Sequence, residues 1–201
     1  MKSVVRLTAA GAMLAASLAT ASAQQAQTQR VLGKIEGVDG KTLVVKTRDG
    51  DVKVGVTDNV AVFGVVNASV ADIKKGAFIG VGAMPQPDGS QKAIRVMIFA
   101  ESQRGTGEGH RPWTQPGSTM TNATVDTTVS SVDGQVLTVK YKDGEKKIVI
   151  PPGLAIQQYV AGDKSELKPG ANILITAAAK KPDGTLEAAR VNVGRDGVVP
   201  N

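Results

Sequence analysis

The chain has 201 residues, a net charge of +6, no cysteine and a single histidine. The absence of cysteine excludes disulfides, and one histidine without cysteine argues against a zinc or other transition-metal site. Aromatic residues make up only 3% of the chain, too few for the stacking platforms that bind nucleic acid. We therefore expect no cofactor, no metal and no nucleic-acid partner.

The first 23 residues have the pattern of a secretory signal peptide. Lys2 and Arg6 form a basic start, residues 7–20 are apolar and rich in Ala and Leu, and Ala21-Ser22-Ala23 is a small-residue cleavage pattern. We expect cleavage after Ala23 and export to the periplasm. The apolar run is shorter than the ~20 residues of a membrane-spanning helix, so the mature chain is not expected to span a membrane. Without a cysteine at the cleavage site, it is not expected to be a lipoprotein.

A hairpin pattern occurs twice in the chain, with an offset of 94 residues. Residues 38–50 begin and end with Asp-Gly turns around alternating apolar residues, and residues 132–144 repeat this arrangement. Asp-Gly favours tight hairpin turns because glycine accepts a positive φ at no steric cost. The alternation places the apolar residues of each strand on one face, which fixes the strand register. The sequence is therefore a duplicated β unit.

The remaining elements follow the same order in both units. After a polar, disordered lead-in at residues 24–29, strands are predicted at 30–38, in the hairpin, and at 60–66, 77–84 and 92–99, with a short helix at 69–76. In the second unit, strands are predicted at 124–132, in the hairpin, and at 154–160, 172–178 and 186–193, with a short helix at 163–170. Asp163 and Glu166 resemble a capping box at the start of that helix.

Runs of short strands separated by glycine-rich turns predict an all-β sandwich or barrel. Five or so strands with a helix between the third and the fourth is the order of an OB-like barrel. We therefore predict an all-β protein with two small OB-like β-barrels in tandem, each with one short helix. The barrels span residues 30–100 and 123–196, a Gly/Pro-rich linker spans 101–122, and a tail follows at 197–201. An open SH3-like barrel or a small sandwich is the alternative for each unit.

The linker contains the only Trp and the only His of the chain. In one interpretation it is a recognition loop, in which Trp113 stacks on a ligand while Arg104 and Arg111 hold its charge, with His110 beside them. In the other it is a tether, and Trp113 fills the groove between the two domains. A catalytic group built on His110 would lack rigid support, so we do not expect an enzyme. The glycines at 105, 107 and 109 lack the spacing of nucleotide-binding loops.

The second and third strands of each unit carry basic residues on their polar face. They are Lys46, Arg48 and Lys53 in the first unit, and Lys140, Lys142 and Lys147 in the second. This face could bind an anionic glycan, a lipid headgroup or an acidic envelope protein. The alternative is the solvated outer surface of a barrel, where lysine is common.

Three motifs resemble a known family. They are the repeated Val-Asp-Gly-x-x-Leu-x-Val-Lys-x-x-Asp-Gly unit, Leu-Lys-Pro-Gly at 167–170, and Gly-Ser-Thr-Met-Thr-Asn-Ala-Thr at 117–124. The chain resembles a family of exported bacterial proteins built from OB-like domains of unknown function, usually found in tandem. The resemblance implies a periplasmic β-barrel protein and supplies no catalytic or binding residues.

Two functions follow as hypotheses. The first is an exported, non-enzymatic binding or adaptor protein that uses the basic strand face and the Trp113 loop to contact an envelope partner. The second is a small-ligand or metal-related accessory protein that uses the cleft between the two domains.

Overall fold

The computed structural model describes residues 27–131 and 134–201, and in these residues it is all-β with three short 3-10 turns. The predicted signal peptide and residues 24–26 lie outside the described residues. Thr28 and Gln29, which we predicted to belong to a disordered lead-in, are already part of the first strand and pair with Ala179 and Ala178. None of the helical segments in the described part of the chain is long and apolar enough to cross a membrane.

The strands join into one hydrogen-bonded sheet of 12 strands in the described residues. They are β1 (Thr28–Asp39), β2 (Thr42–Thr47), β3 (Gly50–Ala68), β4 (Phe78–Pro85), β5 (Gln91–Ile98), β6 (Gly109–Pro112), β7 (Thr119–Ser131), β8 (Gly134–Tyr141), β9 (Gly144–Ile150), β10 (Ile156–Ala161), β11 (Asn172–Lys180) and β12 (Leu186–Gly194). The 3-10 turns are η1 (Val70–Asp72), η2 (Glu101–Gln103) and η3 (Lys164–Glu166).

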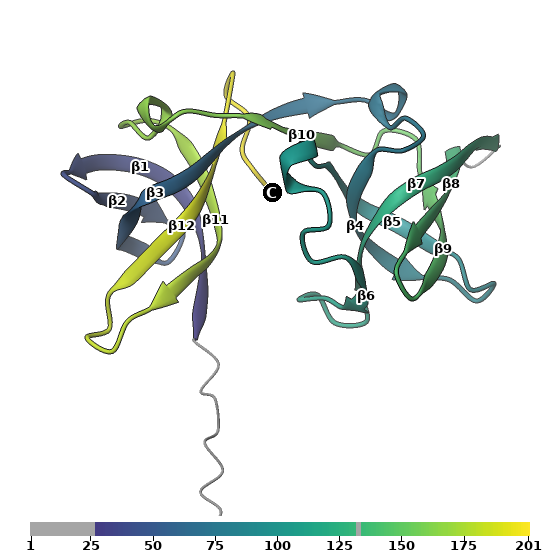
Figure 1. The fold of residues 1–201 in the computed structure, drawn as a ribbon, viewed down its shortest axis with the longest axis horizontal. Helices are drawn as coiled ribbons and strands as arrows, with labels where there is room; N and C mark the ends of the chain where they lie inside the picture. Colours follow the sequence, from purple (N-terminus) through teal and green to yellow (C-terminus); the bar gives the residue numbers. More distant parts are fainter. Residues whose placement is uncertain (1–26, 132–133) are drawn as a thin grey trace, which may run out of the picture.

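The sheet closes on itself twice, and Figure 1 shows the two resulting barrels side by side. Strands β12, β11, β1, β2 and β3 are neighbours in that order, and a parallel pairing of β12 with β3 closes the first barrel. Strands β5, β4, β7, β8 and β9 form the second barrel, closed by a parallel pairing of β5 with β9. Each barrel encloses its own apolar core.

Each barrel combines strands from both repeats. The first core contains Ile35 from the first repeat together with Ile173 from the second, and the second core contains Ile79 together with Ile148. Three strands of one repeat are thus completed by the last two strands of the other. The two cores therefore do not follow the predicted boundaries 30–100 and 123–196, because β4–β5 and β11–β12 have changed places.

The exchange has approximate two-fold symmetry. The crossing strands β3 and β10 pair antiparallel, and at the centre of this ladder Val65 lies opposite Tyr159, its own equivalent 94 residues later. On one side β12 pairs parallel with β3, and on the other side β5 pairs parallel with β10 in the equivalent register. A third small apolar cluster, with Val65, Met97 and Tyr159 at its centre, joins the barrels at this pseudo-two-fold axis.

The predicted hairpins are present, with Thr47 paired to Gly50 in one and Tyr141 paired to Gly144 in the other. The predicted short helices are wrong in extent, since each consists of a single 3-10 turn. Neither turn buries a residue, so no apolar face stabilises a longer helix. The capping box of η3 is present: the Asp163 carboxylate accepts the Ser165 N–H at 2.8 Å, and Glu166 accepts the Asp163 N–H at 2.9 Å.

Candidate functional site

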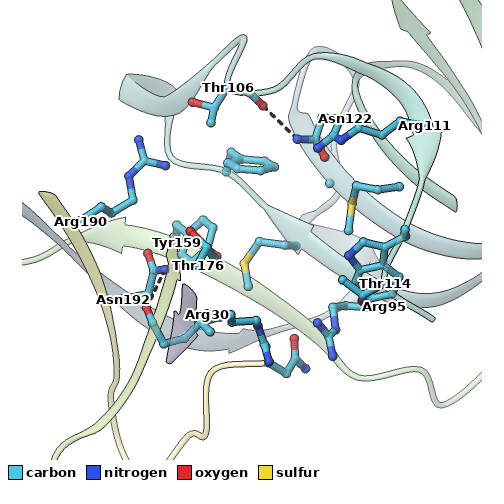
Figure 2. A pocket seen from close by; sticks show the side chains of 17 residues that line it. Arg30, Arg95, Thr106, Arg111, Thr114, Asn122, Tyr159, Thr176, Arg190 and Asn192 are labelled. Atoms are coloured by element: carbon cyan, nitrogen blue, oxygen red, sulfur yellow. Dashed lines mark hydrogen bonds between the residues drawn. The ribbon is translucent and has the colours of Figure 1, made fainter. Parts of the chain in front are cut away.

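A cavity of about 330 Å³ lies between the two barrels, next to the crossing strands. Figure 2 shows that its walls come from both barrels and from the predicted linker. Its apolar lining is formed by Met97, Phe99, Trp113, Met120, Tyr159 and Leu174. The volume is within the range of pockets that hold small organic ligands.

Four arginine side chains line this cavity, and no Asp or Glu lines it. They are Arg30, Arg95, Arg111 and Arg190. Within the described residues, none of the four forms an ion pair. Arg111 donates to the Gly107 carbonyl at 2.7 Å, whereas the other three have no hydrogen-bond acceptor in this part of the chain. The cavity therefore concentrates positive charge that no side chain of the described residues neutralises.

Two of these guanidinium groups pack on aromatic rings. Arg95 lies over the indole of Trp113, 5.0 Å from the ring centroid, and Arg190 lies over Phe63 at 5.4 Å. Stacking orients a guanidinium but leaves the N–H donors at its edge free to bind a carboxylate or phosphate in a bidentate way. Burial, and then the charge of Arg30, lower the pKa of Arg95. The side chain stays cationic at neutral pH, since arginine starts from a very high pKa.

A β-bulge in β5 and another in β12 set the orientation of Arg95 and Arg190. In β5 the alternation of buried residues changes phase between Ala93 and Val96, and in β12 it changes phase between Ala188 and Val191. The strand register shifts at the same places. A bulge turns a side chain away from the face that strict alternation would give it. Strict alternation along the predicted strand 92–99 would place Ile94 on the same buried face as Val96, but Ile94 is 37% exposed.

Tyr159 lies among these charges. Its side chain is buried, and burial raises the pKa of the phenol, while the positive charges of Arg190, Arg95 and Arg30 oppose this rise. The phenol is therefore a neutral hydrogen-bond donor at neutral pH. Tyr159 and these three arginines line the same cavity.

Trp113 is held by its own loop and by β4. Its backbone N–H donates to the Ser118 carbonyl at 3.0 Å, and its ring lies so close to Gly82 that a Cβ atom there would approach it to 2.4 Å. The lack of a side chain at Gly82 allows the indole to rest on the strand. Trp113 thus fastens the loop and also contributes to the cavity wall. Of the other linker residues that we predicted to contact a ligand, Arg111 also lines the cavity.

Arg104 and His110 do not line the cavity. Arg104 pairs with Glu101 and donates to the Gly76 carbonyl at 2.9 Å, which fastens the linker to the second barrel. His110 Nδ1 lies 2.8 Å from the hydroxyl of Thr121, and its ring stacks on Tyr141. Burial first, and the charge of Lys146 second, lower the pKa of His110.

The basic strand residues lie on two separate outer surfaces, away from the cavity. Lys46, Arg48 and Lys53 are exposed on β2 and β3 and at their turn, and Lys140, Lys142 and Lys147 are exposed on β8 and β9 and at theirs. Lys46 pairs with Glu36 and Lys140 with Asp126, each at 3.0 Å. Part of the charge on each surface is thus neutralised within the barrel.

Reasoning from the sequence missed Arg30, Arg95, Arg190 and Tyr159 as residues of a site. A signal for two of them was present: Arg95 and Arg190 occupy equivalent positions of the two repeats, and each has an apolar neighbour on both sides in the sequence. A charged residue in a strand that is apolar on both sides indicates a second, polar environment.

Comparison of the chain with protein-family models, with curated proteins and with solved structures finds no match in any of the three. The resemblance to the exported tandem family therefore stays a prediction. Among residues 27–131 and 134–201, no group of three His, Asp or Glu residues is placed to hold a metal ion.

Proposed function

We propose that this chain is a non-enzymatic binding protein whose ligand is a small organic anion with an apolar or aromatic part, held in the cavity between the barrels. The observation that carries the proposal is a set of four arginines around one cavity, none of which forms an ion pair within the described residues. Arg95 and Arg190 are partly buried, whereas Arg30 and Arg111 are exposed. Partly desolvated charges that lack partners are unfavourable, so an anion that enters the cavity replaces the lost hydration of Arg95 and Arg190 with charge-assisted hydrogen bonds.

The apolar lining supports an organic ligand rather than a bare inorganic ion. Phe99 and Tyr159 meet edge to face, with centroids 5.6 Å apart, and Trp113 also lines the cavity. Such rings favour contact with flat apolar groups. Asn122 and Asn192 also line the cavity, and their side-chain amides donate to the carbonyls of Thr106 at 2.9 Å and Leu174 at 3.0 Å, which holds both side chains in place.

The cellular setting is part of the same proposal. The signal-peptide pattern of residues 1–23 supports export to the periplasm, and the strand order of the two barrels supports an OB-like assignment. The adaptor hypothesis, in which the two basic surfaces bind an envelope protein, glycan or lipid headgroup, receives less support because Lys46 and Lys140 already have acidic partners.

The single tryptophan gives a direct test. We expect 2-naphthalenesulfonate, a flat aromatic monoanion, to change the Trp113 emission of the mature chain, residues 24–201, in a saturable 1:1 titration. Replacing both Arg95 and Arg190 by Gln should weaken binding at least about tenfold, since hydrogen bonds to charged groups contribute about 1.5–3 kcal/mol each.

The matched control is Lys46→Gln with Lys140→Gln, which removes the same charge from equivalent positions on the outer surfaces. The control should bind like the wild type. Equal loss of affinity in both double variants would mean that the probe responds to net charge alone, and no saturable binding to the wild type would contradict the proposal.

A further inference from the structure

The cavity sits where the two repeats are related by symmetry. Arg95 immediately precedes Val96, which pairs with β10, and Arg190 immediately precedes Val191, which pairs with β3 in the equivalent register. Tyr159, which lies in the central pair of the β3–β10 ladder, lines the same cavity. Arg95 and Arg190 are thus related by the pseudo-two-fold axis. Figure 2 shows them on opposite sides of the cavity.

The equivalence extends to the surroundings of the two guanidinium groups. Each follows a bulge in its strand, each stacks on an aromatic ring, and neither has an acidic partner in the described residues. The two aromatic rings, Trp113 and Phe63, are not equivalent in sequence. The two arginines therefore have similar environments because their positions are equivalent, although the aromatic residues that they stack on are different.

Apolar side chains lie between the two arginines. Met97 and Tyr159 belong to the small cluster on the axis, and Phe99 packs against it. Within the described residues, no acidic side chain lines this space to bridge the two positive charges. A ligand with one anionic group would satisfy one arginine and leave the other without a partner.

We infer that the ligand is a dianion, with two acidic groups at opposite ends of an apolar or aromatic body that spans the pseudo-two-fold axis. One acidic group binds Arg95, with Arg30 nearby, and the other binds Arg190. The body lies against Met97 and Tyr159. This inference rests on the proposed function, since it concerns the ligand of the same cavity.

Two probes with one aromatic body test the inference: 2-naphthalenesulfonate and 2,6-naphthalenedisulfonate. Their affinities for the mature chain are measured by isothermal titration calorimetry at equal ionic strength. We expect the disulfonate to bind at least about tenfold more tightly, because a second bidentate pair forms at the other end. Arg95→Gln and Arg190→Gln should each remove this advantage, while Lys46→Gln with Lys140→Gln should keep it.

The outcomes separate the inference from the proposed function. If both probes bind equally well, the ligand does not bridge the two arginines and the inference fails, while the proposed function stands. If neither probe binds, the proposed function fails as well. An advantage of the disulfonate that survives in Arg190→Gln also overturns the inference. Arg95→Lys and Arg190→Lys keep the charge without the planar fork, and intermediate affinity in both would confirm that lost binding in the Gln variants does not come from misfolding.

Discussion

The exchange of strands between the repeats determines which buried side chains pack against each other, and therefore which pairs of substitutions have coupled effects on the free energy of unfolding. Val31 on β1 lies opposite Ile175 on β11, and both are buried in the first core. The equivalent of Ile175 in the first repeat is Val81, which lies in the second core. If each repeat formed its own barrel, Val31 would instead pack beside Val81. A double-mutant cycle distinguishes the two arrangements.

The expected magnitudes follow from burial. Ile175 is fully buried, so Ile175→Ala should lower the free energy of unfolding by about 2–5 kcal/mol. Val31→Ala removes two carbon atoms and should cost about 1.6 kcal/mol, at about 0.8 kcal/mol for each. Because the two side chains are neighbours, their effects should depart from additivity by about 0.5–1 kcal/mol. Val31→Ala and Val81→Ala should be additive within about 0.5 kcal/mol.

The assay is urea unfolding of the three single and two double variants. Circular dichroism and Trp113 fluorescence should give coincident transitions, because free energies of unfolding can be compared only if unfolding is two-state. Coupling between Val31 and Ile175, with none between Val31 and Val81, supports the exchange. The opposite pattern would refute it and would restore the boundaries 30–100 and 123–196.

Two further predictions concern backbone approach and pH. A Cβ atom at Gly33 would lie 2.2 Å from the Lys46 carbonyl oxygen, so Gly33→Ala should lower the free energy of unfolding by about 1–3 kcal/mol or more. Gly37 has open space around it, so Gly37→Ala should be neutral or stabilising by up to about 1 kcal/mol. Equal effects of the two substitutions in denaturant unfolding would contradict this prediction. Hydrogen bonds from Arg195 lower the pKa of Glu166, so this pair stabilises the fold above the unfolded pKa of about 4.3 and loses its effect as pH falls through the lower folded pKa. Arg195→Gln should therefore cost about 1 kcal/mol at pH 7, and most of this difference should vanish at pH 2 in thermal unfolding; a difference independent of pH would show that the ion pair is not its source.

The local structure could be predicted well because it depends on local pattern. The alternation of Leu43 and Val45 with Lys46, and the Asp-Gly turns, fixed the hairpins and the face that is buried. The short helices were overestimated because a capping signal starts a turn, while a helix also needs an apolar face to continue. Bulges at Arg95 and Arg190 could not be predicted, since a single shift of phase looks like noise in a short strand.

The exchange could not be predicted from a duplicated sequence. Ile79 and Ile173 stand in strands with nearly the same apolar pattern, so either strand can close either barrel by local criteria. The choice depends on the connection. Strand β3 continues for 19 residues, from Gly50 to Ala68, and carries the chain out of the first barrel before it can fold back. A continuous strand of this length favours closure with the partner repeat.

The exchange also explains why a site can exist between the barrels. Two independent barrels on a linker would move relative to each other, and a ligand between them would have to order both at a cost in entropy. Here the β3–β10 ladder and the cluster around Val65 and Tyr159 hold the walls in place before any ligand arrives. The same crossing brings the equivalent arginines, Arg95 and Arg190, to one cavity from two different barrels. The strand exchange, which the sequence pattern does not predict, therefore assembles the candidate site.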